Sequence, residues 1–204
     1  EEVMMTKTVD FYFDFASPNA YLSNKALAPI KERTGATVNY IPVLLGGIFK
    51  ATGNKPPMEQ FFGVKGKNEY QSLEMERFIQ RHGLNAFQMN PHFPVMSLQI
   101  IRGAVAADSD GYLEDYIDKI LVHMWEEPKK MDDLEVIKAA FEESGLDSNR
   151  LLEQMQDPEI KAQLIANTEA AVERGVFGIP TFFVGDEMYF GKDTLWQVEE
   201  KLSE

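Results

Sequence analysis

A serine stands where a predicted strand gives way to a predicted helix, and it is the residue best placed for chemistry. Ser17 and Pro18 follow an alternating run of aromatic and acidic residues, and serine and proline favour the N-cap and first turn of a helix. As a cap alone, Ser17 would stabilise that helix by about 1 kcal/mol. The same position offers free N–H groups and the positive end of the helix dipole, which stabilise a thiolate placed there. Because the sequence contains no cysteine, the thiol would have to belong to another molecule.

Two further features could take part in binding. Pro180 precedes a second run of strand-forming residues; a proline often simply begins a strand, and only about 5% of X–Pro bonds are cis. The densest basic run near the predicted site consists of Lys50, Lys55, Lys65 and Lys67. Exposed lysines usually serve solvation, but in an acidic protein an anionic ligand needs a local cation.

The elements that would position these residues follow from the hydrophobic periodicity. Alternation predicts one strand from Thr8 to Phe15 and another from Thr37 to Val43. The helix between them should end at Gly35, and Pro29 predicts a kink or an early end within it. The segment from Gly46 to Pro57 is rich in glycine and proline, which predicts a loop.

Beyond this loop the period becomes helical. Helices are expected at about 66–82, 95–108, 112–127, 132–144 and 157–174. The strand pattern then returns as a hairpin of Thr181–Val184 and Glu187–Phe190, and a last helix is expected from Asp193 to Leu202. The order βαβ, helices, ββα predicts one α/β unit with a large all-helical insertion between its two halves. We therefore expect a discontinuous domain of residues 1–57 and 175–204 and an inserted helical domain of residues 58–174.

The composition excludes several classes of protein. The chain of 204 residues has 20 basic and 33 acidic side chains and a formal net charge of −13, which argues against binding to nucleic acid or to anionic membranes. The absence of cysteine excludes a disulfide framework, thiolate metal sites and redox chemistry by the protein's own thiols, and no metal site is predicted. No apolar run is long enough to span a membrane. The segment from Glu1 to Met5 does not resemble a signal peptide, so a cytoplasmic location is expected.

The arrangement of Ser17 and Pro180 resembles that of thioredoxin-like proteins. In such proteins the first strand runs into a Cys-x-x-Cys motif that opens the first helix, and an X-cis-Pro dipeptide faces the motif. Here Ser17 and Ala20 occupy the places of the two cysteines, and Ile179-Pro180 matches the X-cis-Pro dipeptide. The resemblance implies a thioredoxin-like fold with the helical insertion described above, and a cis bond before Pro180.

A narrower resemblance rests on the combination of Phe11–Pro18 with Gly175–Thr181. Together they resemble the 2-hydroxychromene-2-carboxylate isomerases and the related kappa-class glutathione transferases. Further matching segments are Lys50–Pro57, Asn90–Pro94 and Phe190–Asp193, and the resemblance extends from about Val9 to Leu202. It implies that glutathione is the cofactor and that Ser17 is the catalytic residue, which donates its hydroxyl hydrogen to the glutathione sulfur and holds it as the thiolate.

The resemblance also implies how glutathione is held. The backbone of Ile179, before cis Pro180, would pair with the cysteinyl unit as a short strand. Asp193 would pair with the γ-glutamyl amine, unless it only caps the last helix. Backbone N–H groups of Lys192, Asp193 and Thr194 would bind the γ-glutamyl carboxylate at the start of that helix. Asn54 would contact glutathione from its loop, where an asparagine otherwise simply forms a turn.

For the substrate, the resemblance implies a small aromatic carboxylate whose carboxylate lies beside Lys50, with Asn90 as a second contact. One departure from the family pattern bears on specificity. Relatives commonly carry Asn-Thr where this chain has Met96-Ser97, so a polar group is missing from the expected pocket wall and the exact substrate stays open.

The implied reaction is a glutathione-dependent cis–trans isomerisation by reversible thiolate addition to a conjugated alkene. Two alternatives stay open: a kappa-like glutathione transferase that keeps the adduct, and a non-catalytic thioredoxin-fold module that binds peptides at the cis-proline edge. A disulfide oxidoreductase is excluded by the lack of cysteine. Because relatives are dimers, the resemblance implies a homodimer.

Overall fold

A four-stranded sheet with the order β2-β1-β3-β4 lies at the centre of the protein. The structure is a computed structural model that describes residues 7–204; the segment from Glu1 to Met5 considered above lies outside this range. Strands β1 (Thr8–Phe13) and β2 (Thr37–Pro42) pair in parallel. Strands β3 (Thr181–Val184) and β4 (Glu187–Phe190) form the predicted hairpin, and β3 pairs antiparallel to β1. The two ends of the chain therefore build one sheet, and the predicted thioredoxin-like α/β fold is confirmed.

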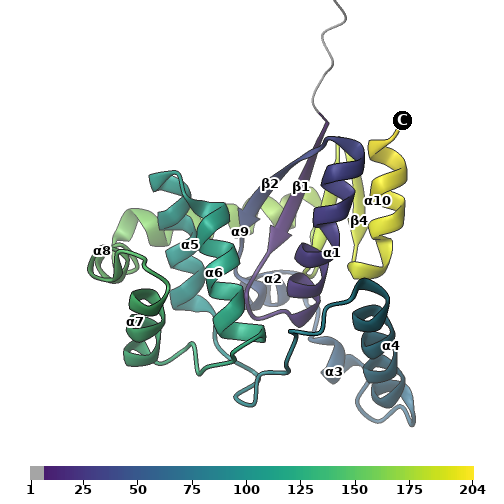
Figure 1. Ribbon diagram of the computed structural model, residues 1–204, viewed down its shortest axis with the longest axis horizontal. Coiled ribbons are helices and arrows are strands. Elements are labelled where there is room, and N and C mark those ends of the chain that lie inside the picture. The colour runs from purple at the N-terminus through teal and green to yellow at the C-terminus, as the bar shows by residue number, and fades with distance from the viewer. Residues whose placement is uncertain (1–6) are drawn as a thin grey trace, which may run out of the picture.

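Helices cover both faces of this sheet. Helix α1 (Pro18–Thr34) and helix α10 (Leu195–Leu202) pack side by side on one face, while α9 (Pro158–Arg174) crosses behind the other (Figure 1). Gly35 ends α1 as predicted, with a φ of 70° that favours glycine. Pro29 stays inside α1, which does not end early. The last helix begins later than predicted, because Lys192–Thr194 forms a separate 3₁₀ turn, η1.

The five predicted helices of the central block are present, and their ends differ from the prediction by no more than three residues. They are α4 (Lys67–His82), α5 (Leu98–Asp110), α6 (Leu113–Trp125), α7 (Leu134–Glu143) and α9. Three short helices were not predicted: α2 (Leu45–Thr52), α3 (Pro57–Gln60) and α8 (Ser148–Gln154).

The prediction that residues 46–57 form a loop was wrong, because most of this segment is α2. Its two adjacent glycines disfavour a helix by about 1 kcal/mol each relative to alanine. Tertiary packing overrides this propensity, since α2 lies closely against α9. A side chain at Gly47 would approach the Thr168 methyl group to 3.2 Å, so the glycine permits this contact.

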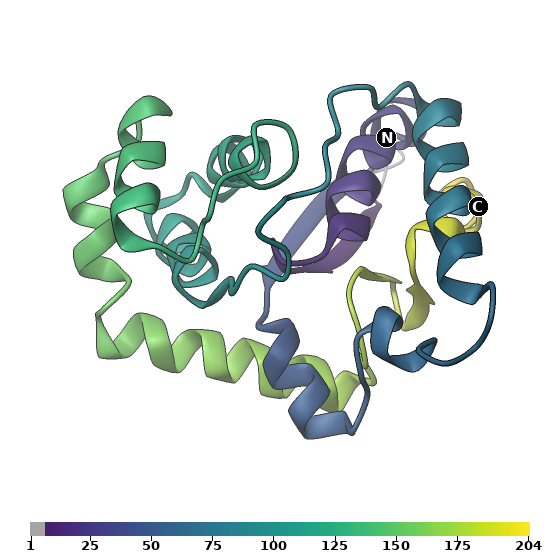
Figure 2. The same ribbon diagram turned by 90° about the horizontal axis from the view of Figure 1, so that it is seen from below.

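The inserted helices lie in three places around the sheet (Figure 2). Helix α4 lies at the lower end of α10 in Figure 1, with α3 beside α4. Helices α5 to α8 gather beyond the β2 side, and α9 runs from that group towards α2. A division of the chain at residues 57 and 175 therefore stays a prediction. Within residues 7–204, the structure has no helix that could span a membrane.

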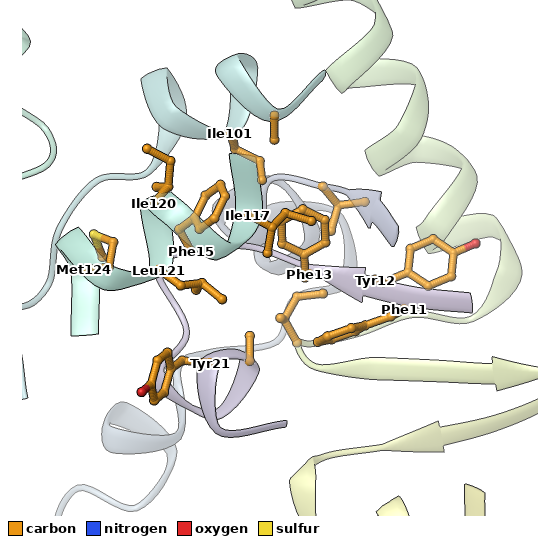
Figure 3. Close-up of a cluster of buried hydrophobic side chains, with 14 of the residues drawn as sticks. Phe11, Tyr12, Phe13, Phe15, Tyr21, Ile101, Ile117, Ile120, Leu121 and Met124 are labelled. Carbon is orange, nitrogen blue, oxygen red and sulfur yellow. The ribbon is translucent and has the colours of Figure 1, made fainter. Parts of the chain in front are cut away.

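One continuous core fixes the turn that carries Ser17. Phe13 and Phe15 flank the beginning of this turn, and both are buried against helices α5 and α6 (Figure 3). The Trp125 indole of α6 donates a hydrogen bond of 2.9 Å to the Phe15 carbonyl. Because aromatic side chains anchor the turn on both sides of Asp14, the start of α1 is held rigidly against the helical insertion.

Candidate active site

Ser17 is both a helix cap and a neighbour of the cis-proline segment. It is the N-cap of α1, and its Oγ accepts a hydrogen bond of 3.2 Å from the Ala20 N–H, which confirms the predicted cap. The same hydroxyl donates to the Ile179 carbonyl over a long 3.5 Å. Ser17 is only 6% exposed. The hydroxyl hydrogen is thus weakly held and directed towards residue 179, so a stronger acceptor at that place could take it.

The Ile179–Pro180 bond is cis, as the resemblance implied. The Pro180 carbonyl accepts from the Gly191 N–H at 3.0 Å, which ties this segment to the end of β4. No residue within 7–204 accepts a hydrogen bond from the Ile179 N–H. The segment therefore presents an open backbone donor next to Ser17, as strand-like binding of a peptide requires. A second cis bond, Phe93–Pro94, was not predicted.

Asn54 joins the loop after α2 to the segment before the cis proline. Its amide Nδ2 donates to the Phe177 carbonyl at 2.8 Å, and its Oδ1 accepts from the Lys55 N–H at 2.9 Å and from the Gln60 amide. The structure thus brings Asn54 close to Ile179, 125 positions later in the chain. Its side-chain groups are used to position that segment, so any direct contact with a ligand would have to share or replace these bonds.

The start of the last helix differs in detail from the prediction. Lys192 is 4% exposed, and its ammonium is held by both Glu74 oxygens, at 2.6 and 2.7 Å, and by Asp193 at 3.1 Å. The alternative that Asp193 caps the helix is wrong, because the cap residue of α10 is Thr194. The Asp193 carboxylate pairs with Lys192 but is largely exposed, so it can also accept from a ligand, whereas the Lys192 ammonium is buried among its carboxylate partners.

Asp14 is a buried residue of this site that the sequence analysis did not single out. Its carboxylate accepts from the Leu45 N–H at 2.8 Å and from the Ala16 N–H at 3.3 Å, and its carbonyl accepts from the Ser17 N–H. Burial raises the Asp14 pKa above its usual value, and hydrogen bonds from Leu45 and the Ser97 hydroxyl oppose that rise. An acidic residue within an otherwise aromatic run was the signal that could have drawn attention to it.

Asn90, one of the two predicted substrate contacts, is bonded to the protein's own backbone. The Asn90 side chain is buried, donates to the carbonyls of Met124 and Lys129 and accepts from the His92 N–H. It therefore stabilises the local backbone, and a substrate contact by Asn90 stays a prediction. Of the two residues that depart from the family pattern, Met96 is exposed and Ser97 is buried beside Asp14. Only the Met96 side chain is therefore accessible to a ligand.

Lys50 lines a cavity of about 510 Å³ between helices α2, α5 and α9. We call it the α2–α5–α9 cavity. Among the residues that the structure describes, neither Ser17 nor Asn54 nor Ile179 belongs to its wall. The described part of the chain holds no group of three or more acidic or imidazole side chains that could bind a metal ion.

Comparison with known proteins places the chain among thioredoxin-fold enzymes. Residues 8–203 match the family described as DSBA-like thioredoxin domain. The chain is 31% identical to a 2-hydroxychromene-2-carboxylate isomerase of Pseudomonas putida over 95% of its own length and 93% of the relative's. It is 27% identical to human glutathione S-transferase kappa 1, with 98% and 92% coverage.

Solved structures agree with these relatives. A 2-hydroxychromene-2-carboxylate isomerase superposes with a TM-score of 0.82 at 30% identity, covering 96% of this chain and 94% of the other. A probable DsbA oxidoreductase of Streptomyces coelicolor, at 19% identity and a TM-score of 0.68 with 96% and 89% coverage, shares the fold alone.

Proposed function

Because the chain belongs to the DSBA-like thioredoxin domain family and, within it, to the 2-hydroxychromene-2-carboxylate isomerases, we propose that it is a glutathione-dependent cis–trans isomerase of an aromatic carboxylate. The named isomerases among its relatives support the isomerase activity. One observation carries the dependence on glutathione: the Ser17 hydroxyl lies at the N-terminus of α1, 3.5 Å from the cis-proline segment, in a chain without cysteine.

The open N–H of Ile179 and the loosely held Ser17 hydroxyl fit a cysteinyl unit. Bound glutathione would supply the thiol that adds reversibly to a conjugated alkene, so that the former double bond can rotate. Ser17 would hold that thiol in its ionised form by donating its hydroxyl hydrogen, and the N-terminus of α1 would add the favourable field of its dipole. The oxygen of Ser17 meanwhile continues to accept from Ala20, so donation and capping are compatible.

Residues around Ser17 would hold the rest of glutathione. The Ile179 backbone would pair with the cysteinyl unit, and Asn54 would fix the segment that presents it. The exposed Asp193 carboxylate would bind the γ-glutamyl amine, and the backbone N–H groups of Lys192 and Asp193 would face the γ-glutamyl carboxylate. The Thr194 N–H, the third predicted donor, donates to the Gly191 carbonyl at 3.2 Å. The Lys192 side chain supports this turn through Glu74. We propose Lys50 as the residue that attracts the substrate's carboxylate.

Product analysis tests the proposal. The protein, glutathione and a 2-hydroxychromene-2-carboxylate are mixed, and both the rotated isomer and free thiol are followed in time. We expect the isomer to accumulate while total glutathione stays constant and while omission of glutathione stops turnover. Turnover at full rate without any thiol would overturn the dependence on glutathione.

A glutathione transferase is the second candidate, favoured by the similarity to human glutathione S-transferase kappa 1. Loss of free thiol in step with formation of a stable adduct would establish it. The third candidate is a module that binds peptides without catalysis. In calorimetric titrations it would show a heat of binding with unrelated extended peptides and none with glutathione.

We also propose a homodimer in the cytoplasm, where glutathione is kept reduced. The dimer is supported by apolar side chains that are exposed on α3, α4 and the loop between them, namely Met58, Phe62, Val64, Tyr70 and Leu73. Phe62 is 85% exposed, which is unusual for a large apolar side chain within such a group. Sedimentation of the Phe62→Glu variant tests this surface. Phe190→Glu, at a half-exposed position on β4, is the control. If the Phe62→Glu variant is still a dimer, the dimer interface lies elsewhere.

A further inference from the structure

The α2–α5–α9 cavity has the size and lining of a small-molecule site. Its volume of about 510 Å³ falls within the range of about 300–1,000 Å³ that ligand pockets occupy. Much of its wall is apolar, with Leu44 from the start of α2, Leu98 from α5 and Ile165 from α9. Such a wall favours a ligand with a flat or branched hydrocarbon body.

Three cations converge on this apolar wall from three helices. Lys50, Arg102 and Lys161 all line the cavity, and none of them forms an ion pair with any residue from 7 to 204. Glu169 is the carboxylate among the lining residues, and it can offset one of the three charges. The chain has a net charge of −13. This local excess of positive charge therefore makes the cavity more attractive to anions than the surrounding surface is.

Arg102 adds a second, independent sign of a missing partner. Its Nε is buried and has no hydrogen-bond partner within the described residues. Leaving a buried donor without an acceptor costs on the order of 1–3 kcal/mol, and more when the group is charged. This enclosed Nε is not itself accessible from the cavity, but Arg102 lines the cavity wall, and a carboxylate there would bind the terminal nitrogens of its planar guanidinium.

The wall of the cavity is held in place by the backbone around it. The Thr168 hydroxyl accepts from the Leu44 N–H at 3.1 Å and donates to the Leu164 carbonyl at 2.8 Å, and the Asn167 amide donates to the Pro42 carbonyl. A side chain at Gly47 would crowd the Thr168 methyl group at 3.2 Å, so α2 and α9 are closely packed here. The site is therefore largely formed before any ligand arrives, which lowers the entropic cost of binding.

From these observations we propose that the α2–α5–α9 cavity binds an aromatic or branched organic dianion. One anionic group would pair with Arg102 and the other with Lys161 and Lys50, while the hydrocarbon body contacts Leu98 and Ile165. The proposal rests on the cavity and its charges, and it stands whether or not the glutathione reaction is correct. Its ligand is either the substrate of the Ser17 site or a separate small molecule.

Calorimetry with three probes of similar shape tests the charge preference. Naphthalene-2,6-dicarboxylate is compared with 2-naphthoate and the neutral 2-naphthamide, each with the full-length protein at low and high salt. We expect affinity to fall in that order, and the dicarboxylate to lose the most affinity in high salt. Equal affinity for the charged and neutral probes would overturn the proposal.

Variants then locate the site. Arg102→Met and Lys161→Gln should each weaken the dicarboxylate at least about tenfold. Their matched controls, Arg81→Met on α4 and Lys138→Gln on α7, are exposed cations outside the cavity and should change nothing. Ile165→Glu brings a carboxylate to a half-exposed position of the wall and should also weaken binding, which keeps the test valid if Arg102→Met fails to fold. Unchanged binding in folded Lys161→Gln and Ile165→Glu would place the probe elsewhere and overturn the proposal.

A final measurement separates the two sources of the ligand. Turnover of the proposed substrate is followed with increasing naphthalene-2,6-dicarboxylate. Competition with the substrate, weakened in Lys161→Gln, would identify the cavity as the site of the substrate's anionic groups. Binding without competition would identify a separate ligand of the same chemistry. A competition that Lys161→Gln leaves unchanged would show that the probe acts at another site and would overturn the proposal.

Discussion

Around Ser17, the polar side chains already have partners within the protein, whereas the α2–α5–α9 cavity presents three cations without one. The Ser17 hydroxyl joins Ala20 to Ile179, and the Asn54 amide joins Lys55 to Phe177. In the cavity, by contrast, Lys50, Arg102 and Lys161 have no ion-pair partner in the described part of the chain.

This difference indicates two kinds of recognition. At the Ser17 site, backbone groups and a neutral hydroxyl are positioned by hydrogen bonds, which suits a peptide-like ligand and the polarisation of one atom. In the cavity, binding would depend on charge and on apolar contact, so its affinity should fall with salt and tolerate changes in ligand shape. Variants of the cavity should therefore leave the affinity for glutathione nearly unchanged, and variants of the Ser17 site should leave the affinity for the dicarboxylate probe nearly unchanged.

The largest expected effect belongs to Ser17→Asp. Aspartate is as good a helix cap as serine and its charge suits the helix N-terminus, so the melting temperature should stay close to that of the parent. The same charge would repel a thiolate, and turnover should fall about hundredfold or more. Ser17→Cys should keep part of the activity because a thiol can still donate weakly.

Thermal melts and steady-state rates for these variants decide the role of Ser17. The matched control is Asp133→Ser at the N-cap of α7, which exchanges the same two residue types away from the site and should retain full turnover. If Ser17→Asp both melts and turns over like the parent, Ser17 is a cap and nothing more.

A smaller effect is expected for Asn54→Asp. Aspartate cannot donate to the Phe177 carbonyl and places a negative charge 2.8 Å from it, so the segment that ends in Ile179 should lose its fixed position. The loss of one such hydrogen bond corresponds to roughly tenfold weaker binding of glutathione. Calorimetry should show this loss for glutathione and no loss for the dicarboxylate probe of the cavity.

Asn149→Asp on the exposed side of α8 serves as the control for the added charge. A parallel loss of affinity for both ligands in Asn54→Asp would show that α2 couples the two regions, and the comparison between them would then fail.

The two regions also differ in how far the sequence could predict them. Ser17 and the cis bond before Pro180 were predicted because each lies in a contiguous motif at the end of a predictable strand or helix. The cavity was not, because Lys50, Arg102 and Lys161 lie on three helices and share no spacing in the sequence. Only the packing of α9 against α2 and α5 brings them together.

Other residues show where a sequence motif stops being informative. Asn90 lies in a matching motif, but the motif did not predict that its amide donates to the carbonyls of Met124 and Lys129, and its contact with a substrate stays a prediction. Helix α2 was missed because its glycines oppose a helix locally, while Gly47 favours close packing against α9 by avoiding a tight contact with Thr168. The four strands themselves were predictable because their alternation is visible in the sequence.

Lys50→Ala should have a modest effect that links the two regions. As an exposed cation it contributes about 0.5–1 kcal/mol to binding an anion, or roughly threefold to fivefold in affinity. We expect that loss for the carboxylated substrate and for the dicarboxylate probe, while glutathione affinity is unchanged. Lys55→Ala is the neighbouring control. Equal losses for substrate and glutathione would remove Lys50 from any specific role.

The smallest expected effect concerns Asp14, which lies between the two regions. Its carboxylate accepts from Ala16 on the Ser17 turn and from Leu45 on α2. Burial raises the Asp14 pKa above its usual value, so the folded protein keeps this proton at a pH where the unfolded chain has released it. Stability should therefore fall as the pH rises from about 4, the usual pKa of an aspartate, and the loss should be complete above the folded pKa.

Urea unfolding of the parent and of Asp14→Asn between pH 4 and 7 isolates this contribution, because all other groups titrate in both proteins. The parent should lose stability relative to Asp14→Asn as the pH rises. Asp132→Asn is the comparison with a pKa shift of opposite direction. Burial raises the Asp132 pKa, but the Lys130 ammonium and the Met96 N–H together lower it below its usual value. There the parent should lose stability relative to the variant as the pH falls below about 4, the usual pKa of an aspartate, when the series is extended to lower pH. A difference between parent and Asp14→Asn that stays constant with pH would mean that the Asp14 pKa is not raised, and that its hydrogen bonds to both regions offset the cost of burying its charge.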